Sequence, residues 1–358
     1  MSAFRKTEDR EFAVLLLEHG VAADDTLPVW SFPGASAQIQ HLACARCAET
    51  KTETPFIYFK YKSEWVYCLT MPTAFAGIPS ASVCVVTKNF NPERWNAVLL
   101  VLFEQYSCSP NADPTKILEG YLSIITTGHF SNAAGTVALS GFSDADAISA
   151  KSGFNVLQDL AAQLGVEAVV LWNAVLLKKR ILVLGDSANK LFQVLRTLPL
   201  LSTSAAAAAS VLLRPLVSAD QPHHLEDLGS AGVFIAGTLD PDMAAQSSLY
   251  DVLLHLPERR VVVSSHAVAE MKMCAAHREV AAILGEAEAG AGGGGSGGGA
   301  GLVAAVGAKT AEIVKSLRDI IAAGAGAGQS AEDAINAKVA NGASQQWLLR
   351  LAAAEGLV

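Results

Sequence analysis

From Gly165 to Met273 the chain alternates apolar helical stretches with short runs of β-branched and aliphatic residues. This alternation predicts strand–helix units whose strands pair in parallel beneath a layer of helices. We therefore predict an α/β lobe with a mostly parallel sheet. Its expected strands are residues 180–185, 209–218, 231–237, 251–256 and 259–265, and its expected helices are residues 154–165, 166–179, 187–201, 222–229 and 266–285.

The preceding part of the chain has a different order, with strands first and two long helices last. Expected strands are residues 11–20, 27–34, 55–61, 64–71 and 80–88, with a first helix at 36–49. Asn91 and Asp113 each precede a proline and a helical pattern, which is the usual chemistry of a helix start. Five strands followed by helices predict an α+β lobe with an antiparallel sheet.

The predicted organisation is an α+β lobe at 1–128, a linker at 129–152 rich in small and polar residues, and an α/β lobe with helices at 153–358. A glycine-rich tract at 285–301 is expected to be a flexible insertion, since such sequence buries no core. The last helical stretch, 344–358, should pack its apolar face back onto the second lobe.

Composition excludes several functions. The formal net charge is −8 and no basic stripe is present, which argues against a nucleic-acid partner and against anionic membranes. The first residues are charged and lack an apolar core, so no signal peptide is expected. The longest apolar run, near 197–213, contains Pro199 and is read as buried or loop, not as a transmembrane segment. The six scattered cysteines are expected to be reduced, which favours the cytoplasm.

Several stretches in order resemble the DENN-domain family, in particular its small DENN-only branch. The matching stretches are NFNPER (89–94), GVEAVVLWNAVLLKKRILV (165–183), RTLP (196–199), AGVFIAGTLD (231–240), LYDVLLHL (249–256), HAVAEMKM (266–273) and LAAAE (351–355). The resemblance implies a longin-like first lobe and a DENN-type α/β second lobe. It implies binding of a Rab-family small GTPase between lobes, with promotion of GDP release. It also implies a peripheral position on late endosomes and association with coiled-coil subunits of the Commander endosomal recycling assembly.

Trp30 and Phe32 are the first candidate partner-binding residues, with Pro33 beside them. Residues at i and i+2 of a strand share one face, and large aromatics dominate binding hot spots. The alternative is that both rings belong to the core, or that Val29 is the buried residue and Trp30 points outward.

Lys178, Lys179 and Arg180 form the second candidate, at the end of an apolar helix. They suit a cationic patch for an acidic partner. They equally suit the negative end of the helix dipole, and both roles are compatible.

Ser187 follows a strand in LVLGDSAN and resembles the nucleophile block of Gly-Asp-Ser hydrolases. The nearest base pattern runs from Asp251 to His255, one residue too long, so we expect Ser187 to cap the following helix.

Cofactors and metals are not predicted. Cys44 and Cys47 form a single CxxC without a second pair at zinc-finger spacing, and the histidines lack ligand partners at suitable spacing. The glycine stretches follow no strand, which excludes a dinucleotide loop. The sequence thus predicts a non-catalytic Rab regulator, with a pure coiled-coil scaffold and a serine hydrolase at Ser187 as alternatives.

Overall fold

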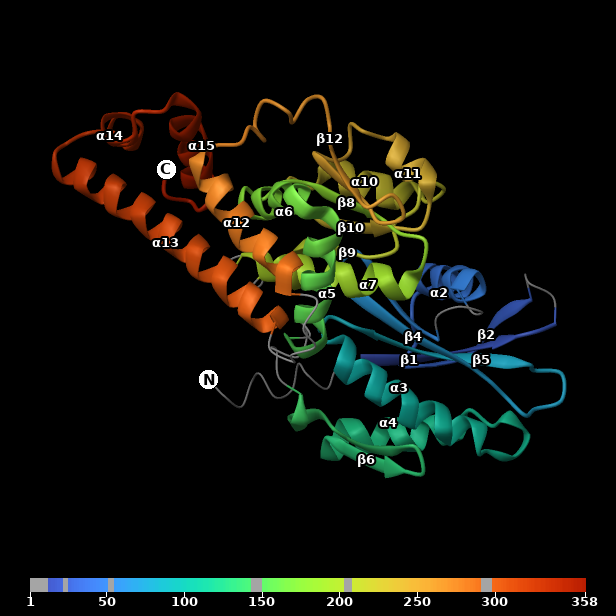
Figure 1. The fold of residues 1–358 in the computed structure, drawn as a ribbon. Coiled ribbons are helices and arrows are strands. Elements are labelled where there is room, and N and C mark those ends of the chain that lie inside the picture. The colour runs from blue at the N-terminus through green and yellow to red at the C-terminus, as the bar shows by residue number, and fades with distance from the viewer. Residues whose placement is uncertain (1–11, 22–24, 51–54, 143–149, 203–207, 291–297) are drawn as a thin grey trace. The chain divides into compact units, whose positions relative to one another are not determined.

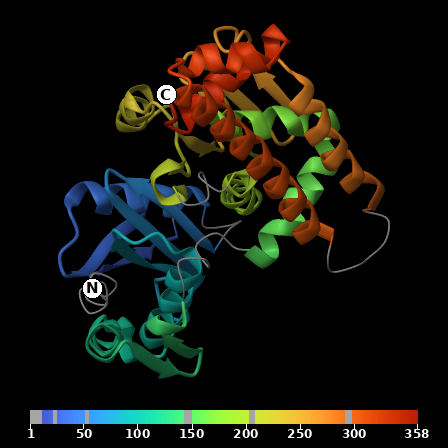
Figure 2. The same cartoon turned by 90° about the vertical axis from the view of Figure 1, so that its left-hand side faces the viewer.

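The computed structural model describes residues 12–21, 25–50, 55–142, 150–202, 208–290 and 298–358. The chain divides into two compact units, Met1–Ala147 and Ile148–Val358. Both are drawn in Figures 1 and 2, and each has its own core.

Unit 1 is built on an antiparallel sheet with the strand order β2-β1-β5-β4-β3. Its strands are β1 (Phe12–His19), β2 (Thr26–Phe32), β3 (Phe56–Tyr61), β4 (Glu64–Pro72) and β5 (Ser80–Thr87). The helices of unit 1 are α2 (Ala37–Thr50), α3 (Pro92–Ser107) and α4 (Thr115–Thr127). The predicted α+β class is confirmed.

Helices cover both faces of this sheet, so the central strands carry apolar residues on both faces. Trp65 and Tyr67 of β4 face α3, where the Tyr67 ring stacks on Trp95 with centroids 6.2 Å apart. Cys68 and Thr70 alternate with them and face α2 on the opposite side. Figure 1 shows α2 on one face and α3 on the other.

Helix starts follow the predicted chemistry with one difference. The Asn91 side chain accepts a hydrogen bond from the Arg94 backbone N–H, and Pro92 opens α3. The Asp113 carboxylate instead accepts hydrogen bonds from the backbone N–H and the hydroxyl of Thr115. Helix α4 begins at Thr115, one residue later than expected.

The segment expected to be a linker contains ordered structure. Strands β6 (His129–Asn132) and β7 (Gly135–Ala138) form a hairpin inside unit 1, and the Asn132 amide donates to the Val101 carbonyl of α3. Small residues here serve a tight turn, with Gly135 at φ 147°. Of the remaining residues of that segment, 143–149 lie outside the described residues, and 150–152 belong to the helix that opens unit 2.

Unit 2 carries a second sheet with the order β12-β11-β8-β10-β9. Its strands are β8 (Ile181–Leu184), β9 (Leu213–Arg214), β10 (Ile235–Thr238), β11 (Val252–His255) and β12 (Arg260–Val263). All neighbours pair in parallel except β11 and β12. The predicted α/β lobe is confirmed, although the strand expected at 209–218 is a short helix followed by two strand residues.

The helices of unit 2 are α5 (Ala150–Leu164), α6 (Ala168–Leu176), α7 (Ala188–Thr197), α9 (Ala209–Leu212), α10 (Pro222–Ser230), α11 (Pro241–Ala245), α12 (Ala275–Gly290), α13 (Gly298–Gly326), α14 (Ala331–Lys338) and α15 (Gly342–Ala354). As predicted, the last one packs back, because Trp347 is buried and its indole N–H donates to Asn173 of α6 at 2.8 Å.

Two expectations for unit 2 were wrong in extent. The helix expected from His266 begins only at Ala275, because residues 265–270 form turns. The tract at 285–301 was expected to be flexible throughout, but 285–290 extend α12 and 298–301 begin α13, while 291–297 lie outside the described residues. Alanine between the glycines gives these ends enough helix propensity once α12 and α13 pack together.

The stretch Phe154–Leu176 is long and apolar enough, by length and composition, to cross a membrane. In unit 2, 61% of its apolar window is buried, and the stretch bends at Gly165, whose φ is 55°. Core helices commonly pass the same test.

Candidate functional site

Strand β2 forms one edge of the unit 1 sheet. In the part of the chain that the structure describes, β2 pairs with β1 alone, which leaves its outer backbone groups available. The pairing shifts between Leu16 and Leu17, so that Val29 is an extra residue opposite this gap. Pro28 is tolerated because an edge strand needs fewer ladder donors. The sequence therefore builds an edge that is open to another chain.

Aromatic side chains line one face of this edge. Trp30 is half-buried, while Phe32 is 41% exposed and stacks on it with centroids 6.4 Å apart. Tyr121 of α4 supports Phe32 edge-on at 5.5 Å. The two predicted residues do share a face, and Pro33 beside them is exposed. The face is neither core nor fully outward, since Phe32 contacts Tyr121 of α4, Trp30 stacks on Phe32, and both rings are partly exposed.

Sequence reasoning missed the remaining members of this surface. Leu27 is 61% exposed and Val29 is 48% exposed, so the edge is apolar beyond the two rings. Exposure of these two aliphatic side chains could not be read from a strand pattern whose register contains a bulge. We call Leu27, Val29, Trp30, Phe32 and Pro33 the β2 edge surface.

The three cationic residues lie in a turn between α6 and β8, and each has a partner within unit 2. The Lys178 ammonium donates to the Ala354 carbonyl, and the Lys179 ammonium pairs with Glu270. Arg180 pairs with Asp251 at 2.8 Å. The three residues are adjacent in the chain, but their side chains bind three different segments and form no common patch.

Asp251 is the centre of the Arg180 contacts. Its carboxylate accepts from the Arg180 backbone N–H at 2.9 Å and from His266 Nε2 at 3.0 Å. Burial alone would raise the pKa of Asp251, but the hydrogen bonds from Arg180 and His266 outweigh it and lower the pKa below 3.8. The negative charge is therefore held at neutral pH.

Ser187 occupies the N-cap position of α7, as expected, but its side chain makes no capping hydrogen bond among the described residues. The hydrolase alternative fails on geometry. Asp251 precedes β11 and His255 ends it, so they lie about 13 Å apart along the strand. They cannot form the acid–base pair that a serine nucleophile needs.

The histidines singled out in the sequence have protein partners. His255 binds Glu258, His266 binds Asp251, and His224 accepts from the Ser218 backbone. His277 accepts from the Cys274 backbone N–H at 3.0 Å, closing the first turn of α12 as a capping residue does. Burial lowers the pKa of His277 to about 4, so it is neutral at pH 7.

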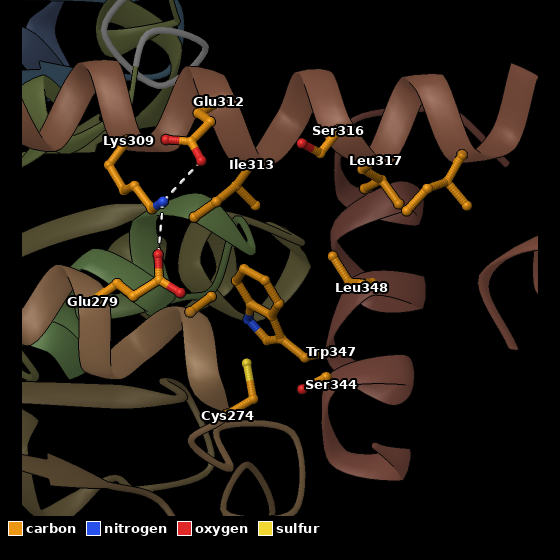
Figure 3. A pocket seen from close by; sticks show the side chains of 12 residues that line it. Cys274, Glu279, Lys309, Glu312, Ile313, Ser316, Leu317, Ser344, Trp347 and Leu348 are labelled. Carbon is orange, nitrogen blue, oxygen red and sulfur yellow. Dashed lines mark hydrogen bonds and ion pairs between the residues drawn. The ribbon is translucent and has the colours of Figure 1, made fainter. Parts of the chain in front are cut away.

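A pocket of about 230 Å³ lies between α12, α13 and α15. Lys309 stands at its rim between Glu279 and Glu312, at 2.7 and 2.9 Å, while Trp347 and Leu348 line its apolar side (Figure 3). The rim thus carries one cation paired with two carboxylates. The arrangement suits an apolar side chain. Cys274 also lines the pocket, and its sulfur lies 3.1 Å from Nδ1 of the buried His277.

Comparison with known proteins places these features in a family. Residues 155–265, from α5 through β12, match the family model "Stabilization of polarity axis" (SPA). DENN domain-containing protein 10 of Danio rerio is 30% identical over 273 residues, which cover 74% of this chain and 75% of that protein. The human protein of the same name is 28% identical over 75% of this chain and 76% of its own length. That of Dictyostelium discoideum is 26% identical over 72% of this chain and 74% of its own length.

An antiparallel α+β unit followed by an α/β unit with an SPA match defines a DENN-type chain. The chain belongs to the DENN domain-containing protein 10 family.

Proposed function

We propose that this chain regulates a Rab-family small GTPase in endosomal membrane traffic, acting as a guanine nucleotide exchange factor. DENN-domain proteins generally have this role, and family membership supports it. The observation that carries the proposal is the β2 edge surface, an open strand edge with exposed Leu27, Val29 and Phe32.

Exchange needs a surface that binds the nucleotide-free GTPase more tightly than the loaded one, and no chemistry of its own. An open strand edge supplies such a surface, because its backbone groups hydrogen-bond a partner strand while its side chains give specificity. Trp30 and Phe32 add aromatic anchors of the kind that dominate binding energy.

We propose a structural role for the three basic residues. Lys178, Lys179 and Arg180 are bound to segments of unit 2, so we assign them to shaping the turn between α6 and β8. Direct contact of these residues with an acidic partner stays a prediction.

A second candidate is a pure scaffold without exchange activity. The pocket between α12, α13 and α15 has an apolar wall and a charged rim, which suits a side chain projecting from a coiled coil. The resemblance noted for the sequence supports coiled-coil subunits of the Commander assembly as its partners, and a peripheral position on late endosomes.

The test is GDP release from a panel of Rab proteins, with the full chain at increasing concentration. Acceleration for one or a few Rabs is expected, and it should be lost in a Trp30→Ala/Phe32→Ala variant. Val268→Ala is the control, because Val268 is 53% exposed but lies in unit 2.

Acceleration of no Rab would contradict the exchange proposal. If a pull-down then retained only coiled-coil proteins, with loss on changing Leu348 to Asp, scaffolding would replace it. Selective labelling of Ser187 by a serine-reactive probe would support the serine hydrolase alternative.

A further inference from the structure

Three cysteine side chains converge in the interior of unit 1. Cys47 comes from α2, Cys68 from β4 and Cys84 from β5, and all three are fully buried. Their sulfur atoms all lie within 4.8 Å of one another. Cys68 and Cys84 are direct cross-strand partners, so the sheet itself sets their separation.

The spacing of these sulfur atoms matches a metal site better than a packed apolar core. Zinc binds cysteine sulfur at about 2.3 Å in a tetrahedron, which places neighbouring sulfurs about 3.8 Å apart. Three sulfurs within 4.8 Å need only a small inward movement to reach that geometry. A disulfide would use two of them and leave the third, whereas one cation uses all three.

Polar groups surround the sulfurs where a core would have aliphatic ones. Ser82 contacts Thr70 at 2.7 Å and His19 Nε2 at 2.6 Å, and all three side chains are buried. Interaction with the two strand cysteines and with Ser82 lowers the pKa of the Cys47 thiol. Such hydrogen bonds orient ligands around a bound metal and stabilise thiolates.

We propose that Cys47, Cys68 and Cys84 bind one structural Zn²⁺ ion, with Cys44 as the fourth ligand. Cys44 precedes Cys47 by three residues on α2, which places both on one helix face. It is only half-buried, and its sulfur is outside the group of three that lie within 4.8 Å of one another, so its side chain moves inward to complete the site. Cys44 therefore gives the ion a way in. Binding releases the thiol protons to solvent, and no bond is oxidised or reduced.

The first test uses the full chain as purified under reducing conditions. Metal analysis should find about one equivalent of zinc per chain, and Co²⁺ exchanged for it should show sulfur-to-metal charge-transfer absorption. Cys47→Val and Cys84→Val should lower the zinc content at least about tenfold. Cys274→Val is the matched control, because Cys274 is also buried but belongs to unit 2.

A second measurement holds even where a variant fails to fold. Alkylation of the wild-type chain should be slowed by Zn²⁺ at Cys44 but not at Cys108, the exposed cysteine on the same molecule. Equal alkylation of Cys44 with and without Zn²⁺ in a folded chain, with no metal retained, would overturn the proposal. Uptake of Cu⁺ without Zn²⁺ would overturn it as well.

Discussion

The β2 edge surface of unit 1 and the basic turn of unit 2 differ in what their side chains are already doing. Phe32 is 41% exposed and rests on Tyr121, with its outer side open. Arg180 looks like the more obvious binding residue, yet it already binds Asp251, His266 and the Ser248 carbonyl. Arg180 is satisfied by groups of its own unit, whereas Leu27, Val29 and Phe32 keep exposed apolar surface that a partner can cover. The two candidate surfaces therefore differ mainly in whether their side chains are available to a partner, and less in residue type.

Acid should lower the folding stability of unit 2 through His277. The pKa of His277 is about 4 in the folded chain and 6.5 in the unfolded chain. Its contribution is complete above pH 6.5 and is lost as the pH falls toward 4, for a total of roughly 3 kcal/mol. Denaturant unfolding of the wild type from pH 7 to pH 4 measures this loss.

The His277→Gln variant is the control for that measurement, because glutamine keeps an acceptor for the Cys274 N–H but does not titrate. Its stability should fall less steeply with acid. Equal slopes for the two chains would contradict the assignment.

Removing the partner of Arg180 should be costly for stability and harmless for binding. In Asp251→Ala the Arg180 backbone N–H and guanidinium lose their acceptor, at a cost of about 2 kcal/mol. Urea unfolding measures it, with Glu258→Ala as the control, since the Arg260–Glu258 pair is exposed and contributes little. Unchanged stability, or lost GTPase binding in the folded variant, would place the basic turn among the contact surfaces.

Phe32→Asp should give the reverse result. The side chain is exposed enough for aspartate to stay solvated, so circular dichroism should show an intact fold. Loss of an aromatic anchor should weaken GTPase binding by about 2 kcal/mol, roughly thirtyfold in Kd. A folded variant with unaltered affinity would remove the β2 edge surface from the interface.

Lys179→Ala and Ser187→Ala should have the smallest effects. The Lys179–Glu270 pair is partly exposed, so its loss should cost less than about 1 kcal/mol. Ser187 makes no capping hydrogen bond among the described residues, so its loss should cost less than about 0.5 kcal/mol. A larger cost at Ser187 would show that its hydroxyl binds a group essential to unit 2.

The sequence predicted elements well where one physical rule dominated. Continuous runs of apolar, β-branched and aromatic residues predicted β1 and β4, and Asn91 before Pro92 predicted the start of α3. Sequence-based prediction failed where small residues could form either a tight turn or a flexible segment. The stretch around Gly135 reads as a linker but forms a hairpin, because a tight turn and a flexible segment use the same residues.

The candidate sites show a second limit of sequence reasoning. The β2 pattern placed Trp30 and Phe32 on one face, but only the structure shows the exposure of Leu27 and Val29. The second cysteine pair was missed because Cys68 and Cys84 are brought together by the pairing of β4 with β5. A register between strands leaves no fixed spacing in the chain, so a search for a second CxxC cannot find it.

The contact between Arg180 and Asp251 also selects how the unit 2 sheet is assembled. Arg180 directly precedes β8 and Asp251 directly precedes β11, and these two parallel strands pair Ile181 with Val252. Parallel pairing joins segments far apart in the chain, so it forms slowly and is open to misalignment. A slip by two residues would keep every apolar side chain on its correct face, and hydrophobic burial alone would barely oppose it. Such a slip would separate the Arg180 guanidinium from the Asp251 carboxylate, so the ion pair favours the aligned register of β8 and β11 over the slipped one.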